Sequence, residues 1–266
     1  MKEKFLEKRI RMVRKKIQLS IGLIGVALLG LGGLGVGQAK AESLDNLKAR
    51  MAEHVKKLER SSRFADSDET RKMEKELEEM YLKMVDQEMK ENKIMEKIDN
   101  LPVVPDKTDR TRAPYGRWTW RDGVIAITNR GISGSWHAGI VAPQRPEVTA
   151  ESSPNTNGVR FMKNFEGRGK VGNHNVWQTG VKSTSISQDW HAGHWAGRQV
   201  GKPYNYNFYR TNNRNSFYCS QLVWAAYMDV AKVNLNTSAY DIPGARAIHP
   251  SELLYNNKVQ LIYRAR

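Results

Sequence analysis

One cysteine, Cys219, and six histidines carry the strongest chemical signal in this chain of 266 residues. Cys219 lies in FYCSQLVWAAYMDV, where apolar residues at helical spacing follow it, so we expect it in the first turn of a helix. The unpaired N–H groups and partial positive charge of a helix N-terminus favour a thiolate and can stabilise an oxyanion. The position predicts a nucleophile, although a lone cysteine at a helix start also fits a packing role.

A thiolate hydrolase also needs a general base and a polar group that orients that base. His137 lies in GSWHAGIVA, which predicts a strand that would hold the imidazole rigidly. The next predicted strand, EVTAES, carries Glu151, which could pair beside His137, with Glu147 as a less favoured candidate. The alternative for His137 is a hydrogen-bonded core residue.

Two further patterns bear on cofactors. HAGH places His191 and His194 three residues apart, but only Asp189 stands near them, whereas zinc sites use three or four protein ligands. No glycine-rich loop followed by Lys and Ser or Thr is present, so nucleotide binding is unsupported. We therefore expect no metal and no cofactor.

Residues 1–41 have the layout of a secretory signal peptide. A basic leader precedes an apolar, glycine-rich run, and Ala39 and Ala41 form a small-residue cleavage site. The run is long enough to serve instead as an uncleaved membrane anchor. Either way the rest of the chain would face outward, in a secreted or cell-wall-associated protein, and the long basic leader suggests a Gram-positive bacterium.

The charge is distributed unevenly. Residues 42–107 contain 14 basic and 17 acidic residues, whereas residues 108–266 contain 20 and 9. A basic secreted domain is attracted to polyanions, which predicts an anionic envelope polymer or a membrane surface as partner and gives no indication of nucleic acid. An ordinary solvated surface is the alternative.

Residues 42–101 are predicted to form a helical hairpin or coiled-coil stalk. Methionine and leucine recur at spacings of three and four in the second half, with Glu and Lys on the other faces. The expected stripe consists of Met73, Leu77, Met80 and Met84. Prolines in 102–114 stop the helix and predict a linker.

Residues 115–266 mix strand and helix patterns, which indicates an α+β domain. Strands are expected at 118–128, 136–142, 147–152 and 258–266, and helices at 186–201 and 217–233. HPSELLYNN suggests a short helix or turn, and residues 160–185 mix loop and short strand without a clear division.

Five segments of this domain occur in an order that resembles a known family. They are HAGIV, VTAESSPNTNGV, GKPYNYNF, FYCSQLVWAAY and HPSELLYNN. Together they resemble the secreted or envelope YiiX-like and YycO-like proteins, which are circularly permuted relatives of the NlpC cell-wall peptidases within the papain-like cysteine hydrolases. The resemblance implies an antiparallel sheet packed on helices. The circular permutation of this family also fits the order in this chain, where His137 precedes Cys219, since ordinary papain-like enzymes place the cysteine first.

The resemblance also implies roles for particular residues. Cys219 corresponds to the nucleophile, His137 to the general base and Glu151 to the residue that orients His137. The tyrosine of GKPY corresponds to a residue on the oxyanion side of the pocket. The expected substrate- or oxyanion-binding residues are Tyr204, Ser220 and Trp136.

These observations predict a secreted cysteine hydrolase that cleaves amide bonds, with peptidoglycan stem peptides as the favoured substrate. A lipid or small-amide acyl hydrolase or acyltransferase is the first alternative, because the permuted architecture is shared with lipid acyltransferases. A non-catalytic envelope-binding module is the second alternative.

Overall fold

The computed structural model describes residues 42–61, 68–109, 113–129, 136–169 and 175–265. The expected signal peptide lies outside these residues. Within them, no helix combines the length and apolar character needed to cross a membrane.

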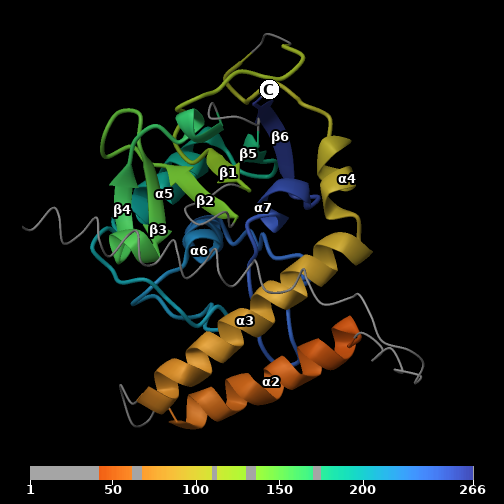
Figure 1. Cartoon of the computed structure of the whole chain (residues 1–266). Coiled ribbons are helices and arrows are strands. Elements are labelled where there is room, and N and C mark those ends of the chain that lie inside the picture. The colour runs from red at the N-terminus through yellow and green to blue at the C-terminus, as the bar shows by residue number, and fades with distance from the viewer. Residues whose placement is uncertain (1–41, 62–67, 110–112, 130–135, 170–174, 266) are drawn as a thin grey trace, which may run out of the picture. The chain divides into compact units, whose positions relative to one another are not determined.

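The domain is built on one antiparallel sheet of six strands, in the order β4-β3-β2-β1-β5-β6 (Figure 1). The strands are β1 Ile125–Thr128, β2 His137–Val141, β3 Thr149–Ser153, β4 Gly158–Met162, β5 Val176–Val181 and β6 Val259–Arg264. Two short 3-10 turns, Pro154–Thr156 and Glu166–Gly169, flank β4. The segment that the sequence left undivided thus contains part of β4 and the whole of β5.

Three helices cover one face of this sheet. They are α5 Ile186–Gly197, α6 Cys219–Ala231 and α7 Glu252–Tyr255. Alternate strand residues such as Ile125, Ile127 and Ile140 join apolar residues of these helices in one buried cluster. Alternation along a strand explains this, because every second side chain points to the same face. The predicted α+β class, with an antiparallel sheet packed on helices, is confirmed.

The N-terminal helical region consists of α2 Leu44–Ser61, α3 Asp68–Glu91 and α4 Ile94–Asp99. Figure 1 shows α2 and α3 side by side. They share a second apolar cluster with loops of the sheet domain. The helices contribute Leu47, Met51, Leu77, Tyr81 and Met84, and the loops contribute Tyr209, Tyr240 and Ile242. The hairpin therefore packs on the domain, and residues 42–265 form one compact unit.

The segment expected as a linker is fixed by buried charges. Asp189 of α5 is fully buried and accepts hydrogen bonds from Lys107 at 2.8 Å and from Arg121 at 2.7 Å. Arg121 also binds both carboxylate oxygens of Asp106, at 2.7 and 2.8 Å. A buried charge is costly unless it is paired, so this network holds residues 106–107 against the domain.

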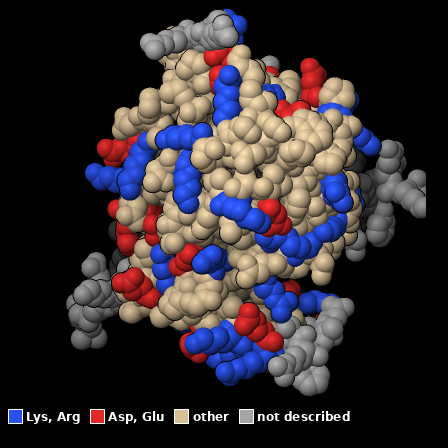
Figure 2. All heavy atoms as spheres, turned by 180° about the vertical axis from the view of Figure 1, so that it is seen from behind, with Lys and Arg blue, Asp and Glu red and all other residues tan. Residues whose placement is uncertain are grey.

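Charged side chains are spread over the surface that Figure 2 presents. Lys and Arg side chains lie among neutral and acidic ones on this face and do not gather into one basic patch.

Candidate active site

Cys219 occupies the first position of α6, as the sequence predicted. Tyr218 precedes it in an extended conformation at the N-cap position, and its hydroxyl accepts a hydrogen bond from the backbone N–H of Ile248 at 2.9 Å. The cysteine is a free thiol with 9% of its surface exposed. The first turn of a helix has unpaired N–H groups and a partial positive charge, so this position favours the thiolate form of the cysteine.

The start of α6 is held by Gln221, which is fully buried. Its side-chain oxygen accepts hydrogen bonds from the backbone N–H of Tyr218 at 3.1 Å and from Asn205 at 2.9 Å. Its side-chain nitrogen donates to the carbonyls of Arg210, Thr211 and Asn213. One amide therefore ties residues 205–213 to the turn that carries the thiol.

His137 and Glu151 meet across two neighbouring strands. The Nε2 of His137 lies 2.6 Å from Oε2 of Glu151. In the register of β2 and β3, Glu151 lies opposite Gly139, whose side of the strand His137 shares. A Cβ on Gly139 would approach Cγ of Glu151 to 2.7 Å. The glycine thus leaves the space through which the carboxylate reaches His137.

Further contacts hold the two side chains in place. Thr149 donates its hydroxyl to Oε1 of Glu151, which is 2% exposed. The buried ring of Phe165 stacks on His137 with centroids 6.1 Å apart. Glu147 is exposed and precedes β3, so the carboxylate bonded to His137 is that of Glu151.

The electrostatics couple His137 to Cys219. Burial alone lowers the pKa of His137, but hydrogen bonds to Cys219 and Glu151 outweigh it and raise the pKa to about 9. Burial acts to raise the pKa of the Cys219 thiol, whereas the hydrogen bond and charge of His137 and the N–H of Ala138 lower it overall. Since Nε2 faces Glu151, Nδ1 is the ring nitrogen left for the sulfur. The arrangement favours a thiolate beside an imidazolium.

Cys219, His137 and Glu151 line one cleft of about 560 Å³. Its other described lining residues come from β3, β4, the start of α6 and neighbouring loops, and from α3. The α3 residues are Glu78, Tyr81, Leu82, Val85, Asp86 and Met89. The helical hairpin, which the resemblance did not cover, therefore supplies one wall of the cleft.

The residues expected to bind substrate also line this cleft. Trp136 stacks on Trp177, with ring centroids 5.7 Å apart. Burial raises the pKa of Tyr204 well above its ordinary value, and the nearby negative charges of Cys219 and Glu78 add to this shift. The hydroxyl of Ser220 donates to the carbonyl of Ile248 at 2.6 Å, so this side chain fastens a loop.

His249 is a further histidine in the cleft. Burial lowers its pKa to about 3, so its ring is neutral at physiological pH. Its Nδ1 lies 2.8 Å from the hydroxyl of Ser251, and its ring packs edge-on against Trp136 at 5.6 Å. Because it is neutral, it adds a polar edge to the cleft without a second positive charge.

The HAGH pair lies outside the cleft on α5, where the ring of Trp190 stacks on His194. In the described ranges, no group of three or more His, Cys, Asp or Glu side chains is placed to hold a metal ion.

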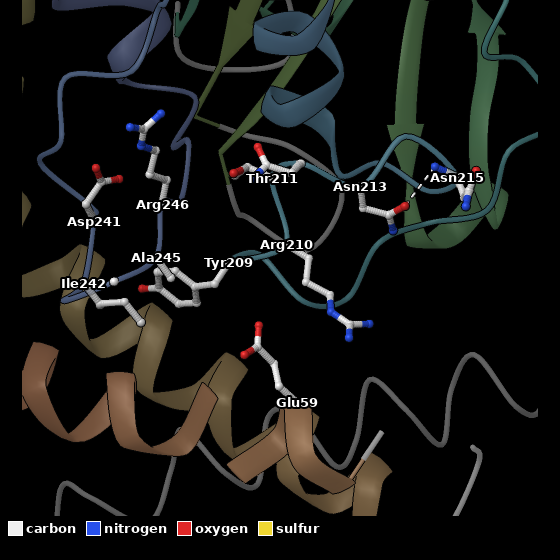
Figure 3. Close-up of a pocket in the computed structure, with 12 residues that line it drawn as sticks. Glu59, Tyr209, Arg210, Thr211, Asn213, Asn215, Asp241, Ile242, Ala245 and Arg246 are labelled. Atoms are coloured by element: carbon white, nitrogen blue, oxygen red, sulfur yellow. Dashed lines mark hydrogen bonds between the residues drawn. The ribbon is translucent and has the colours of Figure 1, made fainter. Parts of the chain in front are cut away.

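A larger hollow of about 1020 Å³ lies elsewhere, between the end of α2 and the loops at 209–215 and 241–246 (Figure 3). Its described lining is polar and charged, including Glu59, Arg210, Asp241 and Arg246, and contains neither cysteine nor histidine. Size alone would favour this hollow, but it lacks a nucleophile and a base. The chemistry instead points to the cleft that contains Cys219.

Comparison with known proteins identifies the fold family. Residues 124–263, just over half of the chain, match the model of the permuted papain-like amidase enzymes, the YaeF/YiiX or C92 peptidase family. The chain belongs to this family. It is therefore a cysteine hydrolase that acts on amides.

A curated relative from Bacillus subtilis (strain 168), the uncharacterized protein YycO, is 25% identical over 260 residues. The alignment covers 93% of this chain and all of YycO, so it extends beyond the segment matched by the amidase family. No solved structure matched the chain. The resemblance stated from the sequence is confirmed.

Several site features have no clear signal in the sequence. Gly139 and Thr149 shape and bind Glu151, but their contributions depend on strand register. That α3 forms a wall of the cleft was also not predicted from the sequence. A stripe at 78, 82, 85 and 89, beside the buried stripe of the same helix, was the available signal.

Proposed function

We propose that the chain hydrolyses amide bonds through Cys219 as nucleophile, His137 as acid and base, and Glu151 as the residue that orients His137. The assignment rests on the contacts of His137 with the other two residues. Its Nε2 lies 2.6 Å from Oε2 of Glu151, and the hydrogen bond between His137 and Cys219 acts to lower the pKa of the thiol. All three side chains line one cleft.

The chemistry follows from these positions. The Cys219 thiolate attacks the amide carbonyl carbon, and the imidazolium of His137 donates its proton to the leaving amine. This leaves a thioester between Cys219 and the acyl group. Neutral His137 then removes a proton from water, whose oxygen attacks the thioester, releases the acid and restores the thiolate and imidazolium pair.

The start of α6 offers donors for the oxyanion. The backbone N–H of Cys219 lies in the first turn, where helix N–H groups have no partner within the helix. Tyr204 lies nearby with a pKa well above its ordinary value, mainly because it is buried, so its phenol stays protonated and can donate. We place the oxyanion between these two groups.

The substrate we favour is a peptidoglycan stem peptide in the envelope of the cell. The support comes from the match to the permuted amidase family, from the sequence resemblance to relatives of the NlpC cell-wall peptidases, and from the signal-peptide pattern of residues 1–41. An anionic envelope polymer or membrane surface is the corresponding partner, and extracellular or wall-associated placement is the corresponding location.

Mass spectrometry of muropeptides tests this substrate. Purified cell walls are incubated with the wild-type chain and with Cys219→Ala. We expect new amine and carboxylate termini in stem peptides with the wild type alone. Intact walls after incubation with a wild-type protein that still cleaves model amides would exclude this substrate while leaving the amidase assignment in place.

An acyl amide is a second candidate, because the cleft is largely apolar. Tyr81, Leu82, Val85 and Met89 line one wall, and Trp136, Met162 and Phe208 lie on the other sides. Release of fatty acid from lipid vesicles or N-acyl amides, absent in Cys219→Ala, would favour this substrate over stem peptides. The non-catalytic alternative would be supported if Cys219 were unreactive toward iodoacetamide at neutral pH.

A further inference from the structure

Helix α3 presents two adjacent stripes with different surroundings. Leu77, Tyr81, Met84 and Glu88 are buried and face α2 and the domain. A second stripe follows at the same spacing, four, three and four residues apart, and lines the active-site cleft: Glu78, Leu82, Val85 and Met89. Residues at these spacings lie along one side of a helix. The cleft side is thus a continuous surface of α3.

The buried stripe fixes this surface relative to the nucleophile. The ring of Tyr81 packs on Phe208 with centroids 4.7 Å apart, and Phe208 packs edge-on against Tyr218 at 5.2 Å. Tyr218 directly precedes Cys219. On α2, Lys48 donates to the carbonyl of Ala239 at 2.7 Å, which holds the hairpin to a loop of the domain. A chain of aromatic contacts therefore connects α3 to the residue before the thiol.

The cleft stripe is apolar along most of its length. Leu82 is 54% exposed, although large aliphatic side chains usually avoid water, and Val85 and Met89 are half-buried. An apolar surface that faces a cleft favours an aliphatic group of a ligand. This stripe offers such a group a place beside the scissile bond.

Most of the charged side chains that line the cleft are acidic. Glu78 stands at the N-terminal end of the stripe, exposed and near Tyr204, and has no ion-pair partner in the described part of the chain. Asp86 also lines the cleft but binds Lys90 at 2.6 Å. No lysine or arginine is among the described lining residues, so His137 is the one cation there. A ligand carboxylate beside α3 would find repulsion, and an ammonium group would find attraction.

We propose that α3 determines substrate specificity: Leu82 holds an aliphatic chain of the substrate, and Glu78, one helical turn away, binds an ammonium group at the end of that chain. Val85 and Met89 extend the apolar surface on the other side of Leu82. The inference rests on the proposed function, since it assigns a substrate class to the same cleft. An amide that carries an aminoalkyl side chain beside the scissile bond fits this wall. A diamino-acid residue in a peptide has this chemistry.

A matched set of thiol reagents tests the proposal without a known substrate. The probes are chloroacetamides with one linear alkyl chain that ends in an ammonium, a methyl or a carboxylate group. The measurement is the rate of Cys219 alkylation by intact-protein mass spectrometry, for the wild type, Glu78→Gln and Glu79→Gln. Glu79 is one residue along α3, 68% exposed and outside the cleft lining, so its variant is a matched control.

We expect the ammonium probe to react faster than the carboxylate probe in the wild type. Glu78→Gln should lower that ratio about three- to fivefold, the effect of one solvated charge pair, and Glu79→Gln should leave it unchanged. An unchanged ratio in Glu78→Gln, or an equal loss in Glu79→Gln, overturns the proposal.

The apolar part is tested separately with Leu82→Ala. This variant should slow the methyl-ended probe about threefold relative to plain iodoacetamide. Ile186→Ala should not, because Ile186 is an equally exposed aliphatic side chain at the start of α5 and lies outside the cleft lining. Equal behaviour of the two variants contradicts the role of Leu82. Plain iodoacetamide reports the proposed function independently: a Cys219 no more reactive than a free thiol would refute the activated nucleophile, whatever the ratio of the charged probes.

Discussion

The two walls of the cleft are built in opposite ways. One wall comes from β2, β3 and the start of α6, where Glu151 and Cys219 are almost fully buried and held by strand register, hydrogen bonds and helix geometry. The other wall is α3, whose cleft-facing side chains, apart from the buried Tyr81, are exposed or half-buried. The aromatic packing of Tyr81 supports this wall. The first wall lies within the segment matched by the amidase family, and α3 lies outside it.

This difference separates chemistry from selection. Proton transfer and nucleophilic attack depend on distances and angles between a few atoms, which only buried, multiply bonded side chains hold. Selection of a substrate group needs a surface of suitable polarity and tolerates more variation in the positions of the side chains. We therefore expect changes in the first wall to act on kcat and changes in α3 to act on KM.

The largest effect is expected for Cys219→Ala. Without the thiolate no acyl-enzyme forms, so kcat for a model amide should fall by about 10⁴-fold or more. The variant removes one sulfur from a site at the start of α6, and its melting temperature should stay close to that of the wild type. Turnover of the amide at a tenth of the wild-type rate would assign the reaction to another group.

Most of the chemically important residues of the first wall could be predicted from the sequence. A lone cysteine before an apolar helix, a histidine on one predicted strand and a glutamate on the next specify local structure and chemistry. Strand register then determined that Glu151, and not Glu147, reaches His137. Period-two patterns assign a face but not the partner position on the neighbouring strand, so Gly139 could not be identified in advance.

The second wall could not be predicted, because α3 packs on loops distant in the sequence. Its contacts to Phe208 and Tyr209 join residues more than a hundred positions apart, and the amphipathic pattern only showed that α3 needed some partner. The buried ion pair of Asp106 and Arg121 could not be predicted from the sequence for the same reason. A polar segment rich in proline predicts a linker unless its ion-pair partners are known.

The next largest effect is expected for Glu151→Gln, which tests how the first wall tunes its base. The carboxylate stabilises the imidazolium, so its loss should lower the pKa of His137 from about 9 and move the alkaline limb of kcat/KM to lower pH. We expect kcat to fall about 100-fold. Profiles of kcat/KM against pH measure both effects.

Glu147→Gln is the matched control for that variant, because it removes an exposed carboxylate four residues earlier in the chain. Its profile should overlay that of the wild type, with activity falling as pH rises past about 9, where His137 loses its proton. An alkaline limb that moves in both variants would show that general surface charge, and not the bond to Glu151, sets the pKa.

Gly139→Ala is expected to have an intermediate effect. The added methyl would lie 2.7 Å from Cγ of Glu151 and 3.2 Å from Cβ of Thr149, so the carboxylate must shift. We expect a loss of about 1–3 kcal/mol in the free energy of unfolding and about tenfold in kcat. Gly180→Ala on β5 meets no atom closer than 3.7 Å and should leave kcat unchanged. A smaller loss of kcat in Gly139→Ala than in Gly180→Ala would rule out the space-making role.

The smallest effect is expected for Tyr81→Leu, which loosens α3 without touching the reacting atoms. The substitution removes the ring that packs on Phe208, so the cleft stripe should lose its fixed position. We expect KM for an aminoalkyl amide to rise about threefold, because the ring of Tyr81 contacts both Phe208 and Tyr209 but touches none of the reacting atoms, with kcat and the alkaline limb unchanged. Tyr81→Phe keeps the ring and should keep the wild-type KM. A fall in kcat with constant KM would mean that α3 positions Cys219 through Tyr218, and the division of labour between the walls would not hold.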